Sequence, residues 1–175
     1  MKAVYATGTN YDDPLSVLEV GTMPEPETKP FWSTIRVNSA SVNHHDVWSL
    51  QGVGLSDEQT PMILGTDAAG VLEEDIPVRK GLKAGSEVVL YTFVGTDGAG
   101  VMPGERRSIL SERYAGTMAE YTQVPSANVF AKPANLNLDE AAALGTSCLT
   151  AYSLLFASAN VKPGDTVLIQ GAGGG

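Results

Sequence analysis

Cysteine is almost absent from this sequence, because Cys148 is the only one among 175 residues. A single thiol cannot form a disulfide within the chain, so the fold must be held by its apolar core. It also cannot build a zinc site of the kind that uses four cysteines. We expect Cys148 to behave as a small buried apolar residue.

Basic residues are also scarce. The chain has 11 Lys and Arg against 20 Asp and Glu, which gives a net charge of -9 and a pI near 4.6. Proteins that bind nucleic acid or an anionic membrane surface need clustered Lys and Arg, so we expect neither partner. The charge does not exclude one phosphorylated cofactor, because a helix N-terminus and a few local charges bind phosphate.

Long apolar runs are missing too. No stretch reaches the roughly 18 apolar residues that a membrane span needs, and the first residues do not form a secretion signal. With 43% hydrophobic and 18% charged residues, the composition is typical of a globular protein rather than a disordered chain. We therefore expect a cytoplasmic protein without a membrane partner.

Glycine and proline are common, with 19 and 10 residues. They indicate many turns and a strand-rich fold. Asn137, followed by an acidic first turn, is expected to cap a helix. The expected strands are 2–5, 15–20, 34–42, 68–72, 87–94 and 129–131, and the segment 114–124 is expected to be an exposed loop that leads into a strand. The expected helical segments are 43–50, 139–144 and 149–157.

The end of the chain carries a further signal. The apolar run 166–169 is followed by the glycine-rich segment 171–175. A buried strand that leads into a glycine-rich turn is typical of the start of a dinucleotide-binding βαβ unit, which needs about 30 residues. We therefore expect a strand-rich domain at residues 1–130. Residues 131–175 are expected to hold bridging helices and the truncated start of a nucleotide-binding domain.

Recognisable segments follow one another along almost the whole chain: SVNHHDVW at 41–48, LGTDAAG at 64–70, AGSEVV at 84–89, GTMAEY at 116–121, the helical segment 144–152 and VKPGDTVLIQG at 161–171. Their order resembles the N-terminal part of the medium-chain dehydrogenase/reductase superfamily, which includes zinc alcohol dehydrogenases and quinone oxidoreductases. The resemblance implies a GroES-like, partly open β-barrel, mainly β with some α, then bridging helices and the first strand of a truncated Rossmann domain. It also implies NAD or NADP as cofactor, a small-molecule substrate and a homodimer for the full-length enzyme.

The sequence departs from the zinc enzymes of this superfamily at the catalytic metal. Those enzymes hold zinc with a cysteine, a His-Glu pair after a glycine, and a second cysteine. The matching positions here are Asn43, then Thr66 with Asp67, then Thr146. Asp67 is the only good zinc ligand among them, and one carboxylate cannot hold a site that needs three or four protein ligands. The comparison predicts no metal ligands, no zinc, and a chain nearer to the quinone oxidoreductases.

Both histidines are adjacent, at His44 and His45. Histidine titrates near neutral pH and relays protons. From the superfamily positions that they match, we predict that His45 donates or relays a proton at the nicotinamide end of the cleft, while His44 faces the cofactor phosphates. Asn43 and Asp67 are predicted to form a polar pair beside the substrate. The alternative is that these residues only cap a short helix and stabilise the barrel.

Three further positions are predicted to touch the cofactor. Thr150 matches a position where the superfamily packs a threonine against the nicotinamide ring, although its hydroxyl could instead bond back into its own helix. Gly171 and Gly174 are predicted to form the phosphate turn, because glycine permits a tight bend and a close approach of the pyrophosphate. The residue that selects NAD or NADP lies about 20 residues beyond such a turn, so both cofactors stay open.

The patterns together predict a fragment of a zinc-independent, NAD(P)-dependent oxidoreductase that transfers hydride to or from a carbonyl, an enone or a quinone. One alternative is a zinc-type alcohol dehydrogenase with substituted ligands. Another is a GroES-like scaffold module without catalysis. The 175-residue chain alone is expected to be inactive, because its dinucleotide site lacks the helix and strands that follow the glycine turn.

Overall fold

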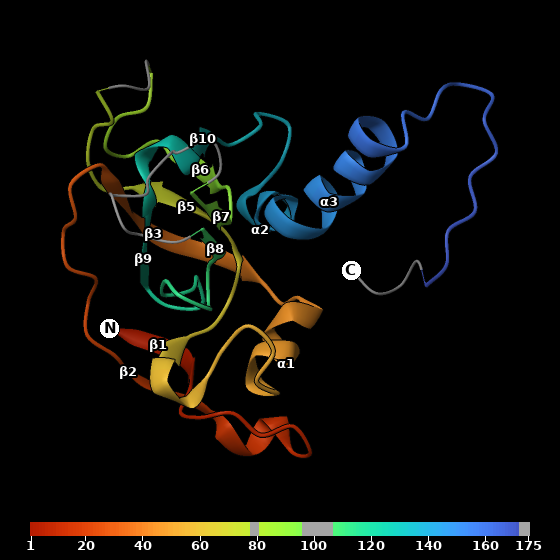
Figure 1. The fold of residues 1–175 in the computed structure, drawn as a ribbon. Helices are drawn as coiled ribbons and strands as arrows, with labels where there is room; N and C mark the ends of the chain where they lie inside the picture. The colour runs from red at the N-terminus through yellow and green to blue at the C-terminus, as the bar shows by residue number, and fades with distance from the viewer. Residues whose placement is uncertain (78–80, 96–106, 172–175) are drawn as a thin grey trace.

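Antiparallel β-sheets form the body of the computed structural model, which describes residues 1–77, 81–95 and 107–171 (Figure 1). The strands are β1 (Lys2–Ala6), β2 (Leu18–Thr22), β3 (Trp32–Ser41), β4 (Met62–Ile63), β5 (Asp67–Leu72), β6 (Glu87–Leu90), β7 (Phe93–Val94), β8 (Ser108–Ile109), β9 (Tyr121–Pro125) and β10 (Val129–Ala131). The helical segments are η1 (Pro14–Val17), α1 (His44–Leu50), η2 (Asp57–Gln59), η4 (Ser126–Asn128), α2 (Leu138–Ala142), η5 (Leu144–Cys148), α3 (Leu149–Tyr152) and η6 (Ser153–Ser158).

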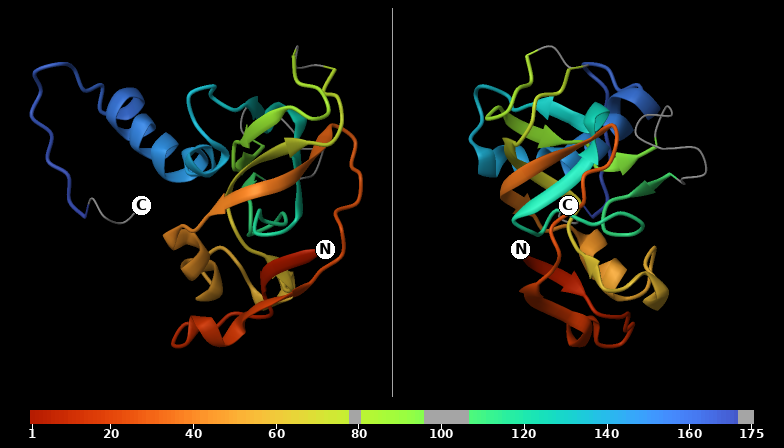
Figure 2. Two further views of the ribbon diagram at one scale, coloured as in Figure 1. Left: turned by 180° about the vertical axis from the view of Figure 1, so that it is seen from behind. Right: turned by 90° about the vertical axis from the view of Figure 1, so that its left-hand side faces the viewer.

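The largest sheet has the strand order β10-β6-β5-β3-β9 and curls into a half-barrel (Figures 1 and 2). Two of its strands approach closely at Gly70 on β5. A Cβ there would lie 2.2 Å from the carbonyl oxygen of Arg36 on β3, so only glycine fits. A register shift between Val37 and Ser39 places a bulge in β3 beside this contact, and bulges increase the local twist of a strand.

The main apolar core lies inside the half-barrel. It combines side chains of the large sheet with Val94 on β7 and Leu110, which follows β8. Burial of each such Val, Leu or Ile side chain stabilises the fold by about 1.5–3 kcal/mol. The fully buried members include Ile35, Leu72, Val88, Leu110, Val124 and Val129.

Helix α1 is held by a second apolar cluster and by one buried carboxylate. Its Leu50 packs with Leu64 beside the small sheet β2-β1-β4. Asp46 accepts hydrogen bonds from the backbone N–H groups of Asn43 at 2.8 Å and Gly65 at 3.0 Å, which tie the first turn of α1 to the residues before β5. Burial raises the pKa of the Asp46 carboxyl above its usual 3.8, against the lowering effect of these two hydrogen bonds.

Helix α2 is seated on the large sheet. The side chain of Asn137 accepts a hydrogen bond from the N–H of Glu140 at 2.9 Å, which confirms the predicted cap. Ala141 and Ala142 pack against Ala69 on β5. Small side chains on both elements allow the helix to lie close to the sheet.

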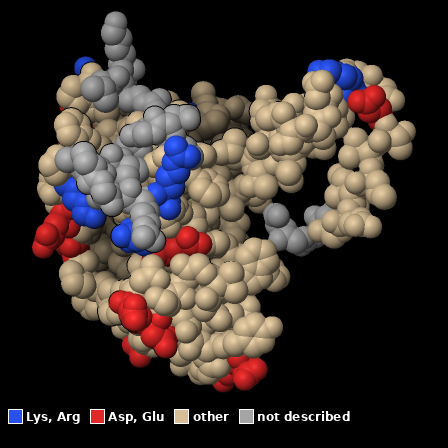
Figure 3. All heavy atoms as spheres, viewed as in Figure 1, with Lys and Arg blue, Asp and Glu red and all other residues tan. Residues whose placement is uncertain are grey.

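Residues 144–171, here called the arm, extend away from the barrel (Figures 1 and 2). On the face seen in Figure 3 the arm shows charged side chains only at its tip. Its large apolar side chains are exposed, with Leu154 at 59% and Phe156 at 52%. Among the described residues, no helix is both long enough and apolar enough to cross a bilayer.

Two expected strands differ from the structure. In the segment 15–20, a turn of 3-10 helix precedes β2, because Pro14 has the fixed φ that suits the first turn of a helix. The segment 87–94 is divided into β6 and β7. The side-chain amide of Asn128 donates to the carbonyl oxygens of Tyr91 at 2.9 Å and Phe93 at 2.7 Å, which replaces strand pairing at the break.

Two expectations about burial are wrong for the arm. The run 166–169 pairs with no strand among the described residues and Leu168 is 86% exposed, so the expected buried strand does not form. A strand needs a neighbour for its backbone N–H and C=O groups, and here no sheet lies beside the run. Cys148 is exposed because it lies on the arm, outside both apolar clusters of the barrel.

Gly145 joins the arm to the barrel and provides a test of the packing. A Cβ at this position would lie 2.6 Å from Asp67 Oδ1 and 2.9 Å from the carbonyl oxygen of Leu90. We expect Gly145→Ala to lower the free energy of unfolding by roughly 1–3 kcal/mol, because the arm must shift away from the sheet. Urea unfolding followed by circular dichroism measures this. Gly8→Ala is the control, since its Cβ would meet contacts no closer than 3.6 Å; equal losses in both variants would contradict the prediction.

Asp46→Asn tests the buried carboxylate. It removes one acceptor oxygen, so one of the two backbone N–H groups loses its partner, and we expect a loss of roughly 1–3 kcal/mol at neutral pH. Because the folded pKa of Asp46 is raised above 3.8, the folded chain binds this proton more readily than the unfolded chain. Lowering the pH from neutral toward 3.8 therefore stabilises the wild type relative to Asp46→Asn, which does not titrate there.

The deficit of Asp46→Asn is expected to grow as the pH falls over this range. Chemical unfolding of both chains at a series of pH values measures it, and the titrating groups that do not interact with Asp46 cancel in the comparison. A stability deficit that shrinks as the pH falls would contradict a raised pKa for Asp46.

Candidate functional site

The carboxylate of Asp67 is the centre of a hydrogen-bonded cluster at the start of β5. Asp67 is fully buried. Its Oδ2 accepts hydrogen bonds from Ser41 Oγ at 2.8 Å and Asn43 Nδ2 at 2.9 Å, and its Oδ1 accepts one from Thr146 Oγ1 at 2.6 Å. The donors come from the end of β3, from the residue before α1 and from η5 on the arm.

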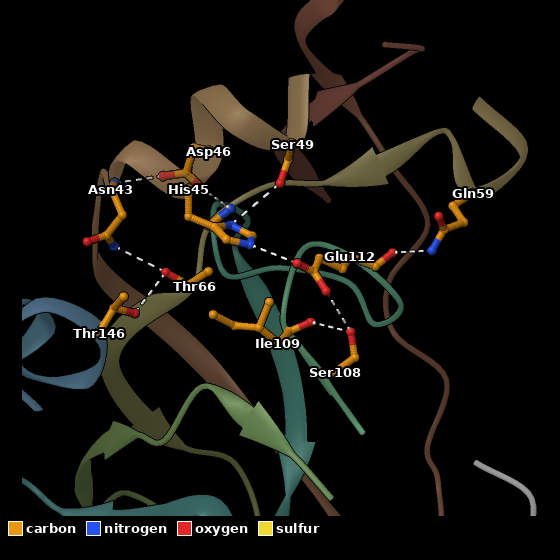
Figure 4. Close-up of polar contacts among 11 residues, drawn as sticks. Asn43, His45, Asp46, Ser49, Gln59, Thr66, Ser108, Ile109, Glu112 and Thr146 are labelled. Atoms are coloured by element: carbon orange, nitrogen blue, oxygen red, sulfur yellow. Dashed lines mark hydrogen bonds and ion pairs between the residues drawn. The ribbon is translucent and has the colours of Figure 1, made fainter. Parts of the chain in front are cut away.

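Thr66 closes this cluster. Its Oγ1 accepts a hydrogen bond from Asn43 Nδ2 at 3.1 Å and lies 3.0 Å from Thr146 Oγ1. Figure 4 shows Asn43, Thr66 and Thr146 directed toward one another. Ser41, Asn43, Thr66, Asp67 and Thr146 are called the Asp67 cluster below.

The Asp67 cluster contains the positions that the superfamily resemblance assigned to zinc ligands, and the structure brings them together. Their chemistry does not fit zinc, which is bound by thiolate, imidazole and carboxylate groups. The cluster offers one carboxylate, and both oxygens of that carboxylate already accept hydrogen bonds. Within residues 1–77, 81–95 and 107–171, no three His, Cys, Asp or Glu side chains converge to hold a metal.

His45 lies on α1 beside this cluster, and its ring points toward Glu112, on the side away from Asn43 (Figure 4). Its Nε2 is 3.1 Å from Glu112 Oε1, and its Nδ1 is 3.5 Å from Ser49 Oγ. The side chains of His45 and Glu112 are 15% and 25% exposed. His45 is therefore held between α1 and the segment that follows β8.

His44 points elsewhere. It is exposed, and its ring centroid lies 5.4 Å from that of Trp48 on the next turn of α1. Adjacent residues on a helix face different directions, so the two histidines occupy separate surroundings.

A groove runs between the large sheet and the arm. It has a volume of about 700 Å³ and is lined mainly by apolar side chains of β6, β10 and residues 144–153. Gly145 lines this groove and also lies against the Asp67 carboxylate, so the Asp67 cluster borders it. Thr150 lines an adjoining groove together with Tyr91 and Phe93.

The predicted cofactor positions therefore lie in different places. Thr150 shares the arm with Thr146, whereas His44 lies on the exposed side of α1. Gly171 is exposed and has a φ of 67°, a conformation that suits glycine in a tight bend. Gly174 lies outside the described residues.

Sequence reasoning did not identify Glu112, Ser49 or Ser41 as parts of the site. Glu112 lies 67 residues from His45, so no local spacing links the two. Ser41 is the first residue of the motif 41–48 and the last residue of β3. A helical spacing of four residues between His45 and Ser49 was the one signal present for that pair.

Known proteins resemble this chain over most of its length. Residues 29–134 match the sequence profile of the alcohol dehydrogenase GroES-like domain. A crotonyl-CoA reductase of Streptomyces avermitilis is 33% identical over 192 residues, which cover 95% of this chain and 43% of that protein. A quinone oxidoreductase of Pongo abelii is 29% identical over 150 residues, 86% of this chain and 40% of that protein.

Solved structures agree with the sequence comparison. The crystal structure of an NAD-dependent alcohol dehydrogenase is 36% identical, has a TM-score of 0.79 and covers 94% of this chain and 49% of its own. The chain thus spans less than half the length of these three relatives. The profile match and the half-barrel show that this chain belongs to the alcohol dehydrogenase GroES-like domain family, which is the N-terminal domain of the medium-chain dehydrogenase/reductase superfamily.

Proposed function

We propose that the chain is the substrate-side part of an NAD(P)-dependent oxidoreductase that works without zinc. The observation that carries the proposal is the Asp67 cluster: Asn43, Thr66 and Thr146 stand at zinc-ligand positions of the family but carry amide and hydroxyl groups, which zinc does not favour, and they hydrogen-bond with the single carboxylate or with one another. The similarity to a crotonyl-CoA reductase and to a quinone oxidoreductase supports a carbonyl, an enone or a quinone as the substrate class.

The proposed cofactor is NAD or NADP, which supplies or accepts hydride at the nicotinamide C4 when bound. His44, Thr150, Gly171 and Gly174 are the residues proposed to hold it. We propose that residues 1–130 form the substrate domain and that 131–175 lead into a nucleotide-binding domain. The lengths of the relatives support this division, because the chain covers 43% of the reductase and 40% of the quinone oxidoreductase.

Within this proposal, the Asp67 cluster orients the polar end of the substrate. Both amide protons of Asn43 are directed at Asp67 and Thr66, so the amide oxygen is left as the acceptor that a substrate hydroxyl can meet. Asp67 itself is fully buried and acts by holding Asn43 and Thr146 in place. His45 then donates or relays the proton that accompanies hydride transfer.

We also propose a location, an oligomeric state and a set of partners for the whole protein. The proposal includes the cytoplasmic location expected from the sequence pattern and the homodimer implied by the resemblance. It includes no nucleic-acid or membrane partner, for which the net charge of -9 is the support.

Metal content tests the zinc-free site. After dialysis against zinc and then buffer, we expect less than about 0.1 zinc per purified chain by mass spectrometry, because one carboxylate cannot hold the ion. The triple variant Asn43→Cys, Thr66→His, Thr146→Cys is the positive control. Together with Asp67 it supplies four suitable ligands from the converging positions, and we expect about one zinc per chain. Stoichiometric zinc in the wild type would favour the zinc-type alternative.

Turnover tests the reaction. In the longer protein that contains the proposed nucleotide-binding domain, we expect oxidation of NADH or NADPH with an ortho-quinone, an aliphatic enone or an aldehyde as acceptor. His45→Ala should lower kcat by roughly 100- to 10,000-fold because proton transfer is lost, whereas His44→Ala should mainly raise the KM for the cofactor. The 175-residue chain alone should show no turnover. An unchanged kcat in His45→Ala at every pH would remove His45 from the mechanism.

A further inference from the structure

Glu112 is an acidic residue of the site that has no assigned role, and its carboxylate reaches two other side chains. Oε1 lies 3.1 Å from His45 Nε2, and Oε2 accepts a hydrogen bond from Ser108 Oγ at 3.0 Å. Both carboxylate oxygens are therefore engaged. The side chain stays three-quarters buried, so water competes weakly for these contacts.

The main chain at Glu112 is also held in place. The side-chain amide of Gln59 donates to its carbonyl oxygen at 2.9 Å. On another side, the carboxylate lies against Gly54, where an added Cβ would displace it from its present position. The loop after α1 and the short helix η2, both ahead of β4, thus contact Glu112 from two directions, so it is a largely buried, hydrogen-bonded partner rather than an exposed surface side chain.

The contact with Glu112 determines how the His45 ring is protonated. A carboxylate is an acceptor, so the neutral ring must carry its proton on Nε2 to bond Glu112. Nδ1 is then unprotonated and accepts from the Ser49 hydroxyl, 3.5 Å away. The order Ser49, His45, Glu112 is not a nucleophilic triad, because Ser49 is fully buried and cannot meet a substrate.

We propose that Glu112 is the positioning residue of His45: it holds the imidazole in one orientation and as the Nε2–H tautomer beside the Asp67 cluster. A proton relay depends on which ring nitrogen donates and which accepts, so a fixed tautomer prepares His45 for that role. The catalytic meaning of this assignment rests on the proposed function. The contact and the tautomer are properties of the chain itself.

The test is nuclear magnetic resonance of the 175-residue chain with ¹⁵N-labelled histidine, without cofactor or substrate. The chain has only two histidines, so exposed His44 is an internal reference and His44→Ala assigns the signals. At about pH 9, where an ordinary imidazole is neutral, His45 should show the Nε2–H tautomer. Its ring N–H proton should be observable, because the hydrogen bond and burial slow its exchange with water. The ring N–H of His44 should exchange too fast to be seen.

Matched variants separate positioning from general stability. Glu112→Ala should abolish the ring N–H signal of His45 while the signals of His44 stay unchanged. Ser49→Ala should keep the Nε2–H tautomer, because Glu112 determines it. Glu19→Ala, which removes an exposed glutamate on β2, controls for loss of charge and is expected to change neither ring.

An Nδ1–H tautomer in the wild type overturns the proposal, even if Glu112→Ala fails to fold. A ring N–H signal that survives in folded Glu112→Ala overturns it as well. In the longer protein, Glu112→Ala should lower kcat roughly 10- to 100-fold with little change in KM, as misplacement of a reacting group does. If the tautomer is found but the longer protein has no reductase turnover, the proposed function fails and the assignment of the contact stands.

Discussion

The geometry of the site depends on the hydrogen bonds that the buried carboxylate of Asp67 accepts. Removing a carboxylate from water is costly unless hydrogen-bond donors surround it. Here the donors come from the end of β3, from the residue before α1 and from η5 on the arm. Displacement of any one of these segments would leave part of the carboxylate unsatisfied, so their positions are coupled to one another.

The same constraint places the arm relative to the barrel. Thr146 reaches Asp67 because Gly145 has no side chain between η5 and the sheet. The groove beside the arm has mainly apolar walls, and Gly145 in its wall lies against the Asp67 carboxylate. In the proposed enzyme, this arrangement would direct the polar end of a substrate toward Asn43 and His45, while the apolar remainder lies along the sheet.

Local patterns predicted much of the barrel but not its interruptions. The alternating segment 34–42 forms β3, and Asn137 caps α2 as expected. The pattern of segment 87–94 predicts one continuous strand. In the structure, the side-chain amide of Asn128 donates hydrogen bonds to two carbonyl oxygens in the middle of this segment, and the strand is divided there. The run 166–169 has the apolar composition of a buried strand but has no partner strand within the described part of the chain, and it is exposed.

The sequence by itself determined the family, the order of the elements and the lack of a full set of zinc-binding side chains at the positions matching the metal site. These properties depend on residue identity and on spacings of a few residues along the chain. Only the tertiary structure decided that Asn43, Thr66, Asp67 and Thr146 satisfy one another's hydrogen bonds, and that Glu112 faces His45. Such contacts join residues as much as 80 positions apart, and their geometry is set by the packing of whole strands and helices, which no local pattern records.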